Sequence, residues 1–184
     1  MLPARLLNGT MRAFTIEQLV PSDSMLRDLA QQTDARQIMR FTLPTWQRPE
    51  KWTLSQKVRF IEGIFLNFGC GYLVVNSREW LNTPDAPPAP MAGWLIDGQQ
   101  RVAAIRDFLA GLFPVFGNVY WNMLDRPTQI RRFLSVSFPH FELEYVADEQ
   151  LLKEIYDRLN FGGTPHIEAD RLRLDADLKR SVGA

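Results

Sequence analysis

The chain has 184 residues, 46% of them hydrophobic, with 21 basic and 21 acidic residues, which predicts one domain spanning residues 1–184. Its zero net charge argues against a strongly basic nucleic-acid binder, although a local basic groove stays open. A single cysteine, Cys70, excludes an internal disulfide, and no apolar run reaches the roughly 18–20 residues of a membrane span. We therefore expect a cytoplasmic protein that does not enter a membrane.

Helix signals recur along the chain. Thr15 with Gln18, and Thr53 with Gln56, have the spacing of a capping box, which predicts two helix starts. Further helices are predicted over 99–110, after Pro127 and from 148 onward. Thr164 and Pro165, a cap followed by proline, signal the start of the last one, which leads into residues 166–175.

Strand candidates fall between these helices. They are residues 37–43, 72–76, 93–96, 112–116 and 137–146. The proline-rich stretch 82–93 predicts a surface loop, because proline fixes φ and removes a backbone donor, and a mobile flap beside a site is the alternative. Alternating strands and helices predict an α/β or α+β domain with a mixed sheet.

One stretch places chemistry where a strand meets a helix. WLIDGQQRVAAIRDFLAG, residues 94–111, sets Asp97, Gly98, Gln99, Gln100 and Arg101 at that joint. A helix N-terminus offers unpaired N–H groups and the positive end of the helix dipole, and glycine lets a phosphate approach closely. The carboxylate can hold a divalent cation, and the amides can donate to phosphate oxygens or position water. A plainly capped helix with solvated side chains is the alternative.

Two further stretches carry polar residues or glycines next to predicted helices. FTLPTWQRPEKW, residues 41–52, has Gln47 and Arg48 just before a capped helix. RLNFGGTPHIEADRLR, residues 158–173, has Asn160, Gly162 and Gly163 between two helices. Paired glycines allow positive φ and close approach of the backbone to a ligand. A simple helix stop and turn is the alternative for this second stretch.

Taken in order, QRPxxW, IDGQQR and RLNxGGTP resemble the N-terminal domain family of GmrSD-type restriction endonucleases, over about residues 35–175. The resemblance implies a ParB/sulfiredoxin-like α+β fold, with helices packed around a small mixed sheet. It also implies that the DGQQR segment handles phosphate. Characterised relatives are associated with nucleotide hydrolysis and with DNA restriction, often of modified phage DNA.

The resemblance also assigns residues to roles. The implied catalytic residues are Asp97, Gln99, Gln100 and Arg101, with Asp97 as the expected ligand of Mg²⁺. The implied phosphate- and nucleotide-binding residues are Gln47, Arg48, Gly98, Arg101, Asn160, Gly162 and Gly163. Trp46 and Trp52, on either side of Gln47 and Arg48, are the best candidates for stacking on a base.

The chain departs from its relatives in two places. They usually have Thr-Gly-Gly where this chain has Phe161-Gly162-Gly163, so a hydroxyl contact is lost or Phe161 stacks on a base. Longer relatives carry a C-terminal HNH-type nuclease domain. Here the two histidines, His140 and His166, are far apart in sequence, so we expect no histidine-based metal nuclease within this chain. We expect His140 and Cys70 to be structural.

The leading interpretation is a nucleotide-binding domain that acts in or near DNA restriction or phage–host conflict, and hydrolysis of nucleoside triphosphates with Mg²⁺ stays open. Two alternatives stay open: a DNA-nicking nuclease that uses the same site, and a non-catalytic subunit that binds nucleotide or DNA. The expected partners are a nucleotide, DNA and a separate nuclease subunit.

Overall fold

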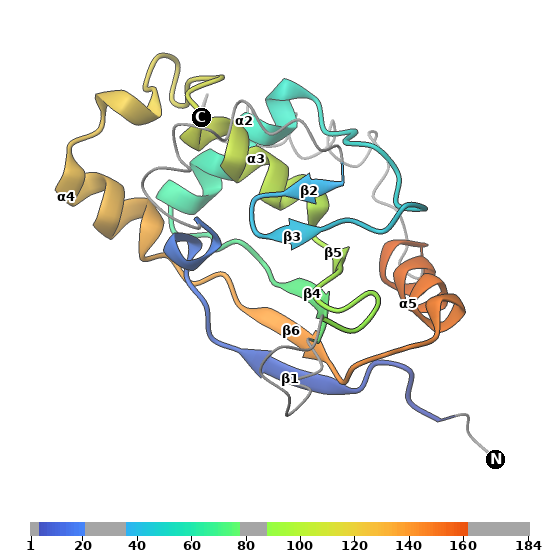
Figure 1. The fold of residues 1–184 in the computed structure, drawn as a ribbon. Coiled ribbons are helices and arrows are strands. Elements are labelled where there is room, and N and C mark those ends of the chain that lie inside the picture. Colours follow the sequence, from blue (N-terminus) through green and yellow to red (C-terminus); the bar gives the residue numbers. More distant parts are fainter. Residues whose placement is uncertain (1–3, 21–35, 78–87, 162–184) are drawn as a thin grey trace, which may run out of the picture.

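A mixed four-stranded sheet forms the centre of the fold. The computed structural model describes residues 4–20, 36–77 and 88–161. The strands, in spatial order, are β1 (Gly9–Arg12), β6 (His140–Leu143), β4 (Leu73–Asn76) and β5 (Leu95–Asp97). β4 runs parallel to β6, whereas β1 and β5 are antiparallel to their neighbours (Figure 1). The expected α+β fold with a small mixed sheet is confirmed.

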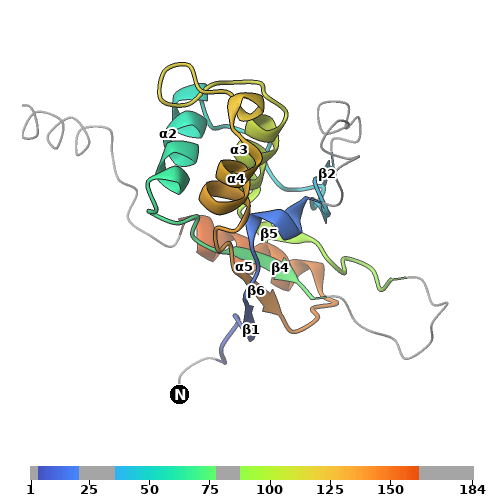
Figure 2. The same ribbon diagram turned by 90° about the vertical axis from the view of Figure 1, so that its left-hand side faces the viewer.

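Helices cover both faces of this sheet. The helices α2 (Leu54–Phe65), α3 (Gln99–Leu109) and α4 (Arg126–Gln129) gather together, and α5 (Glu149–Phe161) lies apart from them (Figures 1 and 2). On the α5 side, Val74, Ile96 and Leu143 of the sheet pack with buried residues of α5. Because side chains alternate along a strand, Leu73 and Leu95 face the opposite way, into the larger core around α2 and α3.

Local signals explain where the helices begin. At α2, the Gln56 Oε1 accepts from the Thr53 N–H at 2.8 Å, which completes the predicted capping box. A 3-10 helix, Ile16–Leu19, follows Thr15 in the same way. The Asp125 carboxylate accepts from the Thr128 N–H at 2.8 Å at the start of α4. The chain then continues as a π-helix, Ile130–Leu134, which buries Phe133 in the core.

Several strand predictions need correction. Residues 112–116 do not form a strand: only Val115 makes an isolated bridge, to Val119, across a turn in which Phe116 has a φ of 47°. Residues 37–43 divide at Met39, which has a φ of 52°, into a hairpin of β2 (Gln37–Ile38) and β3 (Phe41–Thr42). The strand expected over 137–146 is confined to β6, and 72–76 and 93–96 correspond to β4 and β5 with shifted ends.

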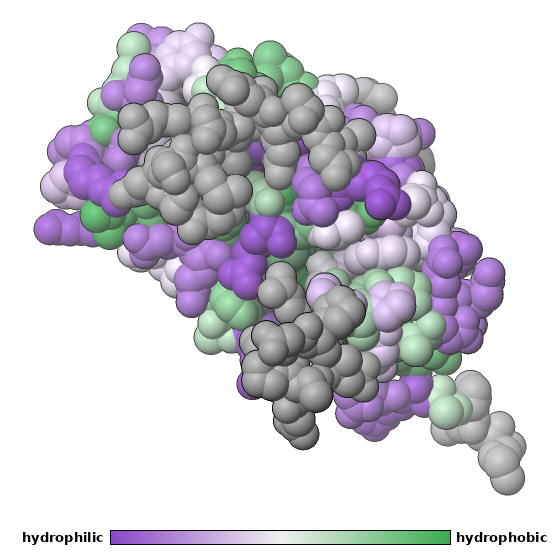
Figure 3. Space-filling model, viewed as in Figure 1, coloured by the Kyte–Doolittle hydropathy of each residue, from purple (hydrophilic) through white to green (hydrophobic). Residues whose placement is uncertain are grey.

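The visible surface is mostly polar. Outside the grey atoms, the face in Figure 3 is largely hydrophilic, and apolar side chains form small separate patches on it. Among the described residues, no helix combines the length and the apolar character needed to cross a lipid bilayer. The helix predicted over 166–175, with its start signal at Thr164, lies outside the described residues.

Candidate functional site

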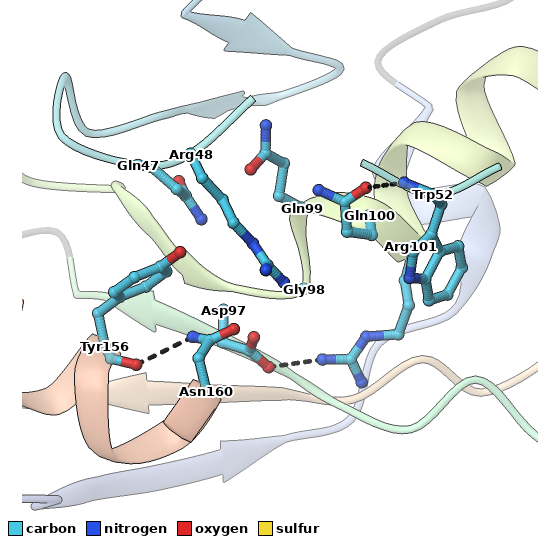
Figure 4. Close-up of a pocket in the computed structure, with 10 residues that line it drawn as sticks. All are labelled: Gln47, Arg48, Trp52, Asp97, Gly98, Gln99, Gln100, Arg101, Tyr156 and Asn160. Carbon is cyan, nitrogen blue, oxygen red and sulfur yellow. Dashed lines mark hydrogen bonds and ion pairs between the residues drawn. The ribbon is translucent and has the colours of Figure 1, made fainter. Parts of the chain in front are cut away.

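The three sequence motifs meet at one cavity of about 200 Å³. It lies where β5 passes into α3, beneath the loop before α2 and beside the last turns of α5 (Figure 4). The residues that line it are Gln47, Arg48, Trp52, Asp97, Gly98, Gln99, Gln100, Arg101, Tyr156 and Asn160. Every predicted site residue in the described part of the chain is therefore here. Gly162, Gly163, Phe161's side chain and His166 lie outside what the structure describes.

Gly98 is the N-cap residue of α3, but it has no side chain that could accept from the first-turn N–H groups. Its φ of 108° is in the left-handed region, and no side chain caps the helix end. A Cβ added at this position would overlap the side chain of Leu73. The first-turn N–H groups of an α-helix have no intrahelical partner, so this uncapped end presents donors and the positive dipole end to the cavity.

Asp97 pairs with a neighbour on the helix. Its Oδ2 accepts from the Arg101 Nη2 at 2.6 Å, so the carboxylate does not cap α3 (Figure 4). The pair neutralises one charge of each sign at the cavity wall. Asp97 is also the only carboxylate among the described lining residues, and no described group of three Asp, Glu, His or Cys residues could hold a metal ion. The described lining therefore offers one carboxylate to a metal ion, and Mg²⁺ at Asp97 stays a prediction.

The loop 69–71 makes room for Arg101. Gly71 has a φ of 71°, and a Cβ there would lie 2.5 Å from the Arg101 Nη1. Cys70 is buried beside it, as the sequence predicted. Burial raises the pKa of the Cys70 thiol to about 12, although the charge of Arg101 opposes this shift. The thiol is therefore protonated at neutral pH, and the structural expectation for Cys70 agrees with its environment.

Gln100 holds the loop that carries Arg48. Its Oε1 accepts from the backbone N–H of Lys51 at 2.8 Å and from that of Trp52 at 3.0 Å. Its Nε2 reaches only the Pro49 carbonyl, at 3.5 Å. The side chain thus faces the loop rather than the open cavity, although sequence reasoning gave it a catalytic role.

A cluster of four charges fastens the same loop to α3. Lys57 pairs with Asp107 at 2.5 Å and with Glu50 at 3.1 Å, and Arg106 pairs with the same two carboxylates at 2.7 and 2.9 Å. Burial alone would lower the pKa of Lys57, but its hydrogen bonds and charge contacts to Asp107 and Glu50 outweigh this and raise it. None of the three motifs contains Lys57 or Asp107, and the sequence offered no signal for them.

Three polar side chains are left for a ligand. Arg48 has no hydrogen bond or ion pair within the described part of the chain, and its guanidinium extends into the cavity toward Gly98 (Figure 4). Gln99 is 7% exposed, and its amide has no described partner. Gln47 donates from Nε2 to the Ile96 carbonyl at 3.4 Å, while its buried Oε1 has no partner. Because buried polar groups are normally hydrogen-bonded, the unpaired amide atoms of Gln99 and Gln47 leave room for a ligand, whereas Arg48 is an exposed side chain at the rim.

Aromatic side chains border the same cavity. Trp52 lines it, as expected, whereas Trp46 packs edge-on against Tyr156, with ring centroids 5.3 Å apart. Tyr156 was missed; its only sequence signal is its place one helical turn before Asn160, whose Nδ2 donates to the Tyr156 carbonyl at 2.9 Å. His140, expected to be structural, is buried in β6 and does not line this cavity.

Comparison with known proteins identified one family. A family model described as the GmrSD restriction endonuclease, N-terminal domain, matches residues 26–129, which is more than half of the chain. The match includes Gln47, Arg48 and the whole segment from Asp97 to Arg101, and it ends before Asn160. No curated protein and no solved structure matched the chain, so the ParB/sulfiredoxin-like superfamily placement stays a prediction.

Proposed function

We propose that this chain, which belongs to the GmrSD restriction endonuclease N-terminal domain family, binds the phosphates of a nucleotide in the cavity described above. Family membership relates its role to that of restriction endonucleases. The observation that carries the proposal is the unpaired guanidinium of Arg48, which extends toward the uncapped N-terminus of α3. A guanidinium cation and a helix N-terminus that border the same cavity favour an anionic ligand, and phosphate is the anion that such sites commonly bind.

The remaining groups support a nucleotide rather than a bare anion. The Gln99 amide can donate to a phosphate oxygen, while the rings of Trp52 and Tyr156 offer apolar surface for a base or sugar. The side chains of Asp97 and Arg101 compensate each other's charge. Arg48 therefore supplies the uncompensated positive charge of the described lining residues.

We propose hydrolysis as a second, separable step. Gln99 is the side chain best placed to orient a water molecule, because Gln100 is engaged with the loop and Asp97 with Arg101. We propose that any Mg²⁺ enters with the nucleotide, because substrate phosphates often supply part of its coordination. DNA and a separate nuclease subunit stay proposed partners, and the chain's zero net charge gives DNA no general attraction.

Binding and turnover should be measured separately. Thermal stabilisation and phosphate release would be recorded with ATP, GTP, CTP and UTP, each with Mg²⁺ and with EDTA. We expect Arg48→Ala to weaken binding by about tenfold or more, as loss of a charge-assisted contact does. Arg12→Ala is the matched control, because Arg12 is an exposed arginine on β1 that pairs with Glu142.

The outcomes separate the candidate functions. Stabilisation that is lost in Arg48→Ala but not in Arg12→Ala supports nucleotide binding, and phosphate release that is lost in Gln99→Leu adds hydrolysis. Stabilisation without phosphate release supports a binding subunit. No stabilisation by any nucleotide would reject the proposal, and plasmid nicking would then become the assay for the nuclease alternative.

A further inference from the structure

The two neighbouring glutamines differ in what they contact. Successive residues of an α-helix point about 100° apart, so Gln99 and Gln100 cannot serve one ligand in the same way. Gln100 directs its amide oxygen to the loop 47–52, where it accepts two backbone N–H groups. Gln99 is slightly more buried than Gln100, yet its amide has no described partner.

The amide oxygen of Gln100 is fully used. A carbonyl oxygen has two lone pairs, and those of Gln100 Oε1 are taken by the N–H groups of Lys51 and Trp52. Its Nε2 makes only the long contact to Pro49. A ligand could bind to Gln100 only by releasing this part of the loop, which would leave two backbone donors without a partner.

The loop is held on both sides of these contacts. Glu50, next to Lys51, pairs with Lys57 and Arg106, and Gln47 donates to the Ile96 carbonyl in β5. Arg48 lies between these fixed points. Its backbone is thus fixed relative to the start of α3, while its side chain has no described partner.

We infer that Gln100 is a positioning residue, which holds the Arg48 loop over the cavity through its amide oxygen, and that Gln99 is the amide of the pair that contacts the ligand. The role of Gln99 rests on the proposed function, whereas the role of Gln100 does not. The inference removes Gln100 from the catalytic set and divides the DGQQR segment into ligand-facing and loop-holding residues.

Matched substitutions at the two positions test this division. Glutamate keeps an oxygen that accepts both N–H groups but loses the amide donor, while methionine keeps the length and loses both functions. Hydrogen exchange at Lys51 and Trp52 reads the loop contact without any ligand. In Gln100→Met we expect exchange at these two amides to rise by about tenfold, with native protection kept in β4 and α3. Gln100→Glu and Gln99→Met should keep native protection at both amides.

Binding of inorganic pyrophosphate and of the four nucleoside triphosphates completes the test. Gln99→Glu should weaken binding more than Gln100→Glu, because its carboxylate would face the anion. Gln100→Met should bind about tenfold more weakly than native, through a displaced Arg48, and Gln100→Glu should recover part of that loss. A catalytic or ligand-binding amide at Gln100 would instead make Gln100→Glu as defective as Gln100→Met.

Each failure has its own signature. Unchanged exchange at Lys51 and Trp52 in Gln100→Met would overturn the positioning role. If the native chain binds none of the probes, the proposed function and the ligand role of Gln99 both fall, while exchange still decides the role of Gln100. If Gln99→Met binds as tightly as native, Gln99 is not the ligand-facing amide.

Discussion

Acidification should weaken this fold through His140. The residue is 2% exposed, and its ring stacks on Phe14 with ring centroids 4.1 Å apart and has an Nε2 without a described partner. Burial, and then the charge of Arg40, lower the pKa of His140 from 6.5 to about 4. The folded chain therefore keeps this ring neutral where the unfolded chain already protonates it.

The sign and size of the effect follow from linkage. Above pH 6.5 neither state binds the proton, so His140 contributes nothing to the pH dependence. Between pH 6.5 and about 4 the unfolded state binds more protons, and the free energy of unfolding falls as the pH falls. The loss from this group is about 2 kcal/mol at pH 5 and about 3 kcal/mol once the pH is below both pKa values.

Urea unfolding at pH 7.5 and pH 5 would measure the loss, with His140→Phe as the comparison. Phenylalanine keeps an aromatic ring against Phe14 but cannot be protonated, and every other titrating group is common to the two chains. The native chain should lose about 2 kcal/mol more than the variant between these two pH values. Equal losses would refute the reasoning, because they would mean that His140 titrates alike in the folded and unfolded chains.

Two substitutions and one labelling reaction test the packing around Arg101, the burial of Cys70 and the core at Phe133. Gly71→Ala should weaken nucleotide binding, measured by titration, more than Gly69→Ala does. Both glycines have positive φ, but only Gly71 lies against Arg101, so Gly69→Ala controls for backbone strain. Burial raises the pKa of the Cys70 thiol to about 12, so the folded chain holds little of the reactive thiolate at mildly alkaline pH. A thiol reagent should therefore label Cys70 quickly only when the chain is unfolded in urea. Fast labelling of the folded chain would contradict this. Phe133→Ala should lower the urea unfolding free energy by about 3–5 kcal/mol, since Phe133 is fully buried; a loss below about 1 kcal/mol would show that the core refills the space.

The parts of this fold that the sequence predicted are those with local causes. Thr53 and Gln56 lie three residues apart and close the capping box of α2 between themselves. β1 was missed because residues 9–12 are all exposed, and their partner β6 lies far along the chain. The strand predicted over residues 112–116 was wrong, although Phe113 and Val115 are buried, because they reach the core from a turn and not from a strand.

The candidate site divides in the same way. The segment from Asp97 to Arg101 is continuous, so its helix-start chemistry could be predicted locally. That Asn160 and Arg48 reach the same cavity follows only from the packing of α5 and the loop 47–52 against α3, and only the resemblance anticipated it. The engagement of Gln100 depends on where the backbone of Lys51 and Trp52 lies, which no local pattern encodes.

The strand order also limits the sequence in which the elements can fold during synthesis. β6 lies between β1 and β4, so neither of these two earlier strands can pair with it before residue 143 has left the ribosome. α2 and α3, in contrast, both precede β6 in the chain and can pack before it is made. A fragment cut to the family-matched residues 26–129 would lack β1, β6 and α5. It would then expose the apolar face of β4 and β5 and one wall of the cavity, which makes it a poor choice for expression.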